Sequence, residues 1–336
     1  MKWFCSLILI WICASSGNLA LANAGELADA AWRVGQSTNA VSVTRMEWRD
    51  AERNRIVPVK IYSPQSGAGP FPVVVFSHGL GGSREGYEYL GQGWAAHGYV
   101  AVHLQHVGSD DSVWKDVPLG KRMSAMKRAA AQPRNAMDRV QDVSFAIDEL
   151  TRLNATNSIW RGKMDLKRIG VAGHSFGAHT TLATAGAAYS GWGEATLADP
   201  RVKAAIPMSA PVPANKTRLE AAFAGVKIPC LHMTGTKDDS PIGETKAAER
   251  RLPFDHCRNS DQFLITFTDG DHAIFGGRER KFGGAKDAEF QRLISQSSLA
   301  FWDAYLRDDA RAKEWLTTKF KDALGTEGVF EVKLKK

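Results

Sequence analysis

Cysteine is scarce in this sequence, and internal repeats and low-complexity tracts are absent. Four cysteines occur in 336 residues, too few for a disulfide-dense scaffold. The lack of repeats excludes a solenoid or fibrous architecture. No closed set of metal ligands stands out either. His103, His106, Asp110 and Asp111 lie near one another, but at the end of an expected strand, where they are better explained as pocket lining. We therefore expect neither a metal nor a cofactor.

A strong excess of charge of one sign is also missing. The net charge is +7, and it becomes +6 (7 − 1) if Lys2 leaves with a leader. This moderate surplus suits solubility and attraction to anionic surfaces, and it does not indicate nucleic-acid binding. The densest basic cluster lies between Lys115 and Arg139, where it forms either a solvated face or part of an amphipathic helix.

One long apolar run occurs, at the N-terminus. Trp3–Cys13 follows Met1-Lys2 and precedes Ala22-Asn23-Ala24, which has the A-x-A form of a signal-peptidase site. The pattern predicts a signal peptide over residues 1–24, cleaved after Ala24, and a secreted or periplasmic protein. The run is short for a membrane span, so no stable membrane insertion is expected. An uncleaved anchor is the alternative, and no lipobox precedes Cys13.

Apolar segments alternate with helix-compatible segments along the rest of the chain. This alternation predicts an α/β fold in which helices cover both faces of a mostly parallel central sheet of about eight strands. The length suits a single domain over residues 25–336, with a peripheral tail after Trp315. The expected strands are 41–48, 56–62, 72–77, 99–104, 168–172, 202–208, 228–233 and 262–267, and the expected helices are 86–97, 134–153, 176–187, 242–251 and 287–307.

The most informative motif is the glycine-flanked serine in Gly173–Gly177. It directly follows an apolar strand-like run and precedes a small-residue, helix-compatible stretch. A serine at such a strand–turn–helix junction is typical of a nucleophile elbow, where the glycines let strand and helix approach closely. Ser175 is therefore the candidate nucleophile, although the motif alone would also fit an ordinary glycine-rich loop.

Acid and base candidates follow Ser175 in the order that this chemistry uses on such folds. An expected strand over 228–233 runs into a turn with two carboxylates, of which Asp238 is the first choice and Asp239 the alternative. The next strand ends in a glycine-bearing turn that presents His272. A serine hydroxyl needs an imidazole to take its proton, and the imidazole needs a carboxylate to orient it. We predict the set Ser175, Asp238 and His272.

A glycine-rich loop after an earlier strand supplies the expected oxyanion hole. The buried strand over 72–77 leads into His78–Gly82, one strand and one helix before the elbow strand. Backbone N–H groups of Leu80 and Phe176 are the predicted oxyanion donors. Residues 107–133 follow a strand whose end faces the same site, so we expect a possible cap segment there.

Cys230 and Cys257 are the two cysteines that remain after the leader is removed. In an oxidising compartment two cysteines can form one disulfide. Both lie around the loop that carries Asp238, so we predict that they pair. Two buried free thiols are the alternative.

The motifs together resemble the α/β-hydrolase superfamily. The similarity is strongest to the branch of platelet-activating-factor acetylhydrolases, chlorophyllase-like esterases and predicted dienelactone hydrolases. It covers about residues 40 to 307 and implies hydrolysis of carboxylic esters through an acyl-enzyme, with a small-molecule or lipid-like ester as substrate. Dienelactone hydrolases differ by using a cysteine nucleophile, so dienelactone is not expected. The matching segments are Ser77–Gly81, His106–Asp110, Arg139, Asp142, Gly173–Gly177, Gly235–Asp238, Gly270–His272 and Phe275–Arg278.

Two other functions remain open at the level of sequence. The same residues could serve a lipase-like or polyester hydrolase with a wide apolar cleft. The chain could also be a binding protein that has a hydrolase scaffold but no catalytic activity. Such a protein would have lost a triad member, and each triad position is filled here.

Overall fold

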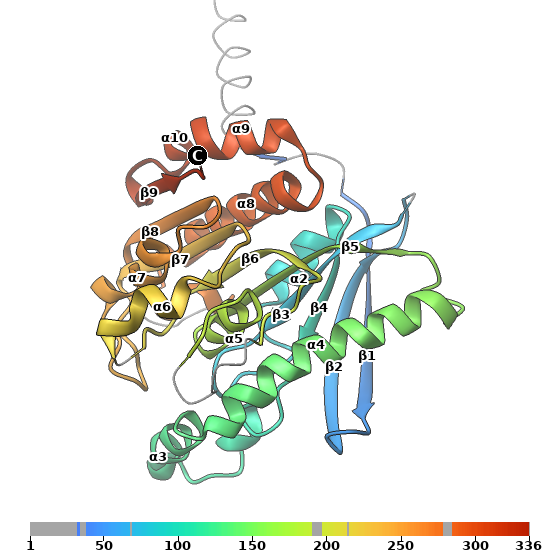
Figure 1. The fold of residues 1–336 in the computed structure, drawn as a ribbon, viewed down its shortest axis with the longest axis horizontal. Coiled ribbons are helices and arrows are strands. Elements are labelled where there is room, and N and C mark those ends of the chain that lie inside the picture. The colour runs from blue at the N-terminus through green and yellow to red at the C-terminus, as the bar shows by residue number, and fades with distance from the viewer. Residues whose placement is uncertain are drawn as a thin grey trace, which may run out of the picture.

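A computed structural model describes residues 32–33, 38–67, 69–189, 197–213, 215–277 and 284–335. One sheet dominates it, with strand order β1-β2-β4-β3-β5-β6-β7-β8-β9 (Figure 1). The five pairings from β4 through β3, β5, β6 and β7 to β8 are parallel, while β1, β2 and β9 join in antiparallel register at the two edges. The predicted α/β architecture with a mostly parallel sheet is confirmed.

The strands form where the sequence offers short, nearly continuous apolar runs. Such runs suit strands that are buried on both faces by crossover helices; the run Phe71–Ser77 is buried from its second residue onward. The strands are β1 (Val41–Asp50), β2 (Arg55–Pro64), β3 (Phe71–Ser77), β4 (Val100–Leu104), β5 (Met164–His174), β6 (Val202–Met208), β7 (Cys230–Lys237), β8 (Gln262–Asp271) and β9 (Gly328–Lys333).

The helices lie on both faces of the sheet, with α4 crossing in front of the strands in Figure 1. Each face has its own buried apolar cluster: one gathers side chains of α4, α5 and α6, and the other gathers side chains of α2 and α8. The helices are α2 (Glu88–Ala96), α3 (Leu119–Ala130), α4 (Pro133–Thr156), α5 (Phe176–Thr184), α6 (Leu219–Phe223), α7 (Leu252–His256), α8 (Asp287–Leu306), α9 (Ala310–Thr318) and α10 (Phe320–Leu324).

The C-terminal region differs from the expectation of a peripheral tail. Its helices α9 and α10 contribute Leu316 and Phe320 to the apolar cluster on the α8 face. Strand β9 then pairs antiparallel with β8 and adds a ninth strand to the sheet. This strand was not predicted, because only a few residues, Val329, Phe330 and Glu331, show the alternation that indicates a strand.

The expected helix over 242–251 is also wrong. In that region the chain forms only a short 3₁₀ turn, Ala247–Glu249, before α7. The turn closes with hydrogen bonds between Lys246 and Glu249. The segment 239–251 is instead an irregular connection that carries Arg250 into the interior, where it is 2% exposed.

The predicted disulfide is not formed, because Cys230 and Cys257 are separate free thiols in the structure. Both are fully buried in the apolar cluster on the α4 face. Burial raises the pKa of the Cys257 thiol to about 12, and it raises that of Cys230 as well. The two side chains therefore stay protonated and pack as small apolar groups.

The predicted signal peptide over residues 1–24 lies outside the described residues. Within the part of the chain that the structure describes, every helix is too short or too polar to span a lipid bilayer.

Candidate active site

Ser175 lies at a sharp turn between β5 and α5. Its backbone has φ 56° and ψ −116°, an unfavourable conformation for a residue with a side chain. The turn is tight because a Cβ added to Gly177 would lie 1.9 Å from the carbonyl oxygen of Ser77 on β3, and one added to Gly173 would lie 2.4 Å from that of Gly177. Only glycine fits at these two positions. The two glycines of the motif therefore permit the tight turn in which Ser175 takes its strained backbone conformation.

The structure brings all three predicted side chains together. His272 Nε2 lies 3.0 Å from Ser175 Oγ, and His272 Nδ1 lies 2.7 Å from Asp238 Oδ1. Ser175 follows β5, Asp238 follows β7, and His272 follows β8, so the three meet at the carboxyl ends of parallel strands. With Nδ1–H donated to Asp238, Nε2 is free to accept the serine proton, which is the arrangement of a nucleophile–base–orienter set.

Burial and hydrogen bonding distinguish the two neighbouring carboxylates. Asp238 is completely buried and faces His272. Asp239 is exposed and turns toward Lys246 and the Ala247 N–H. That N–H and the ammonium of Lys246 lower the pKa of Asp239, and neither group belongs to the site.

Three side chains that the sequence analysis missed surround Asp238. Ser209 Oγ donates to the carboxylate at 2.6 and 2.7 Å, and Thr234 Oγ1 donates at 2.8 Å. Arg250 Nε donates to the Asp238 carbonyl at 3.0 Å and lies 3.4 Å from its carboxylate. Burial lowers the pKa of Arg250, while the charge of Asp238 opposes that shift. Serine after a strand and arginine in an irregular loop carry no motif, so no sequence signal could have found them.

The loop from His78 to Gly82 lies against the elbow, as expected for an oxyanion hole. A Cβ on Gly79 would lie 3.4 Å from Ser175 Cβ. Gly81 N–H donates to the Ser109 carbonyl at 2.9 Å, and Gly82 N–H donates to that of Gly79 at 3.0 Å. Within the described chain, by contrast, the N–H groups of Leu80 and Phe176 have no acceptor. The two predicted donors are thus available to a bound group.

Tyr87 joins this loop to the elbow. Its hydroxyl lies 2.8 Å from His174 Nδ1, and the Gly79 N–H points at the same hydroxyl at 3.4 Å. The ring of His174 also lies 4.7 Å from that of His272. The residue before the nucleophile therefore packs between the base and the oxyanion loop, and burial lowers its pKa far below the ordinary value, so its imidazole is neutral.

The expected cap segment contacts the oxyanion loop directly. Trp114 Nε1 donates to the Gly81 carbonyl at 2.7 Å, and a Cβ on Gly81 would lie 2.6 Å from Met126 Cε. Gly81 has φ 70° and leaves room for both side chains. The helix α3 projects from the lower end of the molecule in Figure 1, and Leu119 and Met123 on it are 81% and 49% exposed.

A network of buried polar side chains contacts the oxyanion loop, His78–Gly82, on its interior side. His78 Nε2 accepts from the His106 N–H at 3.1 Å, and the His106 ring lies between Ser77 Oγ and the Asp142 carboxylate. Arg55 closes the network with two hydrogen bonds to Asp142. Burial lowers the pKa of His106 to about 4, so this histidine is neutral and serves as a spacer rather than a base.

Comparisons with known proteins find one matching family and two curated relatives. The family "Platelet-activating factor acetylhydrolase, isoform II" matches residues 48–127. The fold is that of an α/β-hydrolase. This chain is 26% identical over 153 residues to the platelet-activating factor acetylhydrolase of Cavia porcellus, covering 38% of this chain and 35% of that protein. It is 24% identical over 151 residues to that of Canis lupus familiaris, covering 37% and 34%. The chain thus matches about a third of the length of these curated relatives.

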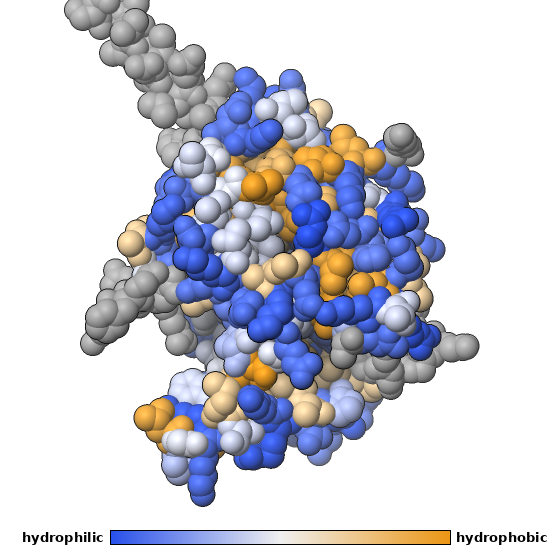
Figure 2. All heavy atoms as spheres, turned by 90° about the vertical axis from the view of Figure 1, so that its left-hand side faces the viewer, coloured by the Kyte–Doolittle hydropathy of each residue, from blue (hydrophilic) through white to orange (hydrophobic). Residues whose placement is uncertain are grey.

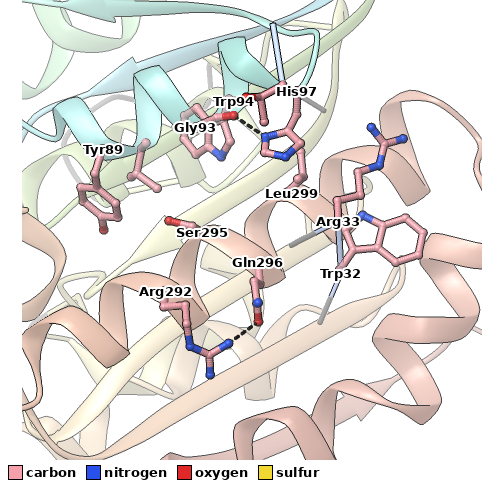
Figure 3. Close-up of a pocket in the computed structure, with 12 residues that line it drawn as sticks. Trp32, Arg33, Tyr89, Gly93, Trp94, His97, Arg292, Ser295, Gln296 and Leu299 are labelled. Atoms are coloured by element: carbon pink, nitrogen blue, oxygen red, sulfur yellow. Dashed lines mark hydrogen bonds between the residues drawn. The ribbon is translucent and has the colours of Figure 1, made fainter. Parts of the chain in front are cut away.

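A separate cavity of about 290 Å³ lies between α2 and α8 (Figure 3). Its walls include Leu90, Trp94 and Leu299, and the amide of Gln296 faces it. None of Ser175, Asp238 and His272 lines this cavity. The described residues also contain no cluster of three or more metal-ligating side chains.

Proposed function

We propose that this chain is an exported serine esterase that hydrolyses carboxylic esters through an acyl-enzyme. The single observation that carries the proposal is the chain of contacts from Ser175 Oγ through His272 to the buried Asp238 carboxylate, at 3.0 and 2.7 Å. The similarity to platelet-activating factor acetylhydrolases supports the same reaction class.

In the first half of the reaction Ser175 Oγ attacks the ester carbonyl carbon. His272 Nε2 takes the hydroxyl proton as the new C–O bond forms, and Asp238 stabilises the resulting imidazolium. The carbonyl oxygen becomes an oxyanion that accepts hydrogen bonds from the Leu80 and Phe176 N–H groups. When the tetrahedral intermediate collapses, His272 gives its proton to the leaving alkoxide, so an alcohol departs and the acyl group stays on Ser175.

Water completes the cycle by the same steps. His272 accepts a proton from water as its oxygen attacks the acyl carbon, and the oxyanion returns to the same two N–H donors. Collapse breaks the bond to Ser175 Oγ, which recovers its proton from His272. A carboxylic acid leaves, and no metal or cofactor takes part in any step.

The relatives' printed names favour an acetyl ester as substrate. The second candidate, a lipase-like or polyester hydrolase, is favoured by the exposed Leu119 and Met123 of α3, because apolar side chains on a cap can meet an acyl chain or an ester surface. Figure 2 shows hydrophobic spheres among hydrophilic ones at the lower end of the molecule, at the height of α3 in Figure 1. In both cases residues 107–133 act as the cap over the acyl site.

Export is supported by the leader alone. The short apolar run ends in small residues, and Ala22-Asn23-Ala24 provides a cleavage site after Ala24. Mass spectrometry of the protein from the culture medium or periplasm should find Gly25 at the N-terminus. An intact leader in a membrane fraction would contradict export by cleavage.

Initial rates on p-nitrophenyl esters from acetate to palmitate, measured with wild type and Ser175→Ala, test the proposed function. The variant should lose up to roughly 10⁶-fold in turnover on the best ester. Rates that fall with chain length support the acetyl-type esterase, and a preference for long chains supports the lipase-like candidate. Activity retained by Ser175→Ala would refute the assignment, and binding of esters without any serine-dependent turnover would favour a silent binding protein.

A further inference from the structure

A completely buried arginine lies behind the proposed oxyanion hole. Arg139 is on α4 and is 0% exposed. Its guanidinium donates to three oxygen atoms on three separate segments: Thr180 Oγ1 at 3.0 Å, Ser109 Oγ at 2.9 Å, and the carbonyl oxygen of His78 in a very close contact. The mechanism above uses none of these contacts, so a costly buried cation remains to be explained.

One side of the guanidinium fixes both ends of the oxyanion loop. The His78 carbonyl, at the start of the loop, accepts directly from Arg139. At its other end the Gly81 N–H donates to the carbonyl of Ser109, whose hydroxyl in turn accepts from Arg139. Leu80 lies between these anchors, so the direction of its unpaired N–H depends on them.

The opposite side of the guanidinium contacts the elbow helix. Its central carbon lies 4.7 Å from the centroid of the Phe176 ring, in the geometry of a cation–π contact. Its Nε donates to Thr180 Oγ1, one turn further along α5, and that hydroxyl donates to the Phe176 carbonyl at 3.0 Å. The residue that supplies the second oxyanion donor is therefore held by the same planar group that holds the first.

The charge of Arg139 is not cancelled by a direct partner. Among the described residues no carboxylate lies within ion-pair distance of it. Burial lowers the pKa of the guanidinium to about 9, while the charge of Asp142 opposes the shift, so the group is cationic at neutral pH. A cation that is fixed in a dry interior stabilises negative charge that develops nearby more strongly than the same cation in water.

We propose that Arg139 is a positioning residue that sets the Leu80 and Phe176 N–H groups at one mutual geometry, and that its charge stabilises the oxyanion they bind. The inference rests on the proposed function, because it assigns a role within that site. Arg139 acts on the reacting atoms through Leu80 and Phe176 and through the field of its charge, without touching those atoms. Its loss should therefore weaken the binding of the transition state and leave ester binding unchanged.

Arg139→Met and Arg139→Lys test the proposal, with Arg307→Met as the matched control. Arg307 donates to two backbone carbonyls, of His97 and Gly98, and lies 4.4 Å from the ring centroid of Tyr99. It thus shares the backbone-carbonyl and ring contacts of Arg139, while differing in its 3.4 Å ion pair with Asp303 and its 24% side-chain exposure. The measurements are kcat and KM on a p-nitrophenyl ester, and the Ki of a trifluoromethyl ketone, which forms an oxyanion on Ser175.

The expected result is a fall of about 10²- to 10³-fold in kcat for Arg139→Met with KM nearly unchanged, the size of losing one oxyanion donor. The Ki of the ketone should rise by the same factor. Arg139→Lys keeps the charge but loses the planar fork, so it should fall between wild type and Arg139→Met. Arg307→Met should lower thermal stability without changing kcat.

Equal losses of kcat in Arg139→Met and Arg307→Met would overturn the inference, because that pattern indicates general destabilisation. A rise in KM with unchanged kcat would overturn it too. If Arg139→Met does not fold, a folded Arg139→Lys variant with wild-type kcat and ketone affinity would do the same. A wild-type enzyme whose turnover does not depend on Ser175 refutes the proposed function itself, whereas Ser175-dependent turnover that ignores Arg139 refutes only the inference.

Discussion

The two sides of His272, the proposed catalytic base, are built in opposite ways. On the acid side, the buried Asp238 carboxylate receives hydrogen bonds from Ser209, Thr234 and His272, so its lone pairs are occupied. On the oxyanion side, the Leu80 and Phe176 N–H groups have no acceptor within the described chain. One side holds a carboxylate whose hydrogen bonds are already formed in the free protein. The other is prepared for a charge that exists only during the reaction.

The acid side and the oxyanion side also differ in which parts of the fold hold their residues in position. Most of the acid side comes from the ends of β6, β7 and β8, which are neighbours in the sheet, and Arg250 adds contacts from the connection after β7. The oxyanion loop needs anchors from outside the sheet: Arg139 on α4, Ser109 after β4 and Trp114 in the cap segment. The Leu80 and Phe176 N–H groups make no hydrogen bonds of their own, so contacts from the surrounding chain must fix their positions.

Replacing Asp238, the central residue of the acid side, should have the largest effect on kcat. Asp238→Asn keeps the shape but replaces the orienting carboxylate, which should lower kcat by about 10⁴-fold because His272 is no longer held in the productive tautomer. Steady-state kinetics on a p-nitrophenyl ester measure it. Asp239→Asn is the matched control and should keep nearly full activity, since Asp239 faces Lys246 at the surface. A reversed pattern would make Asp239 the triad acid.

Breaking the oxyanion side through the backbone should cost less. A methyl group at Gly177 would lie 1.9 Å from the Ser77 carbonyl oxygen, so Gly177→Ala must push α5 away from β3 and displace the Phe176 N–H. We expect kcat to fall by about 10²- to 10³-fold, as for loss of one donor. The measurement is kcat together with the Ki of a trifluoromethyl ketone.

Gly93→Ala supplies the control for a helical glycine. A Cβ at Gly93 on α2 meets nothing within 4 Å and points toward the cavity between α2 and α8. It should leave kcat unchanged and raise the free energy of unfolding by about 1 kcal/mol, because alanine favours the helix. Equal effects of the two substitutions on kcat would show that the elbow does not depend on close contact with β3.

The sequence predicts the parts of this site that obey a local rule. Gly173–Gly177 is recognisable because only glycine permits the approach of α5 to β3, and Asp238 and His272 follow from the order of strands. The same reasoning placed eight of the nine strands. It ranked Asp238 ahead of Asp239 but kept Asp239 as the alternative, since adjacent residues share every sequence signal and differ only in which one the fold buries.

The missed features depend on contacts between distant segments. Ser209 and Arg250 approach Asp238 from separate loops, and no spacing links them. The predicted pairing of Cys230 and Cys257 failed for the same reason: proximity in the sequence to one loop says nothing of the direction of two side chains. Strand β9 was overlooked because an edge strand needs only a few alternating residues once β8 offers it an open edge.

Removing a single hydrogen-bond donor to Asp238 should have a smaller effect on kcat. Ser209→Ala removes the hydroxyl that donates to both carboxylate oxygens of Asp238. A hydrogen bond to a buried charged group contributes about 1.5–3 kcal/mol, so kcat should fall by roughly 10- to 100-fold. Thr234→Val, which removes one donor to the same carboxylate, should cost less. A double mutant that loses no more than Ser209→Ala alone would show that Thr234 does not contribute.

The last prediction concerns acid stability rather than turnover, and it belongs to the oxyanion side. The folded pKa of His106 is about 4 because burial and the charge of Arg139 disfavour the imidazolium more than the hydrogen bond to Asp142 favours it. Its ordinary pKa is 6.5. Between these two values the unfolded chain binds a proton that the folded chain does not. The free energy of unfolding therefore falls as pH drops, by up to about 1.4 kcal/mol per pH unit from this residue.

Urea unfolding of wild type and His106→Asn from pH 7.5 to pH 4.5 measures this contribution. The variant should be less stable at pH 7.5, because it breaks the contacts to Ser77 and Asp142, yet its stability should fall less steeply on acidification. Identical slopes would mean that His106 gains its proton at the same pH in the folded protein as in the unfolded chain, so that it is already a cation in the acidic part of this range. In that case the network beneath the oxyanion loop would carry a second cation beside Arg139, and the charge that supports the oxyanion could not be assigned to Arg139 alone.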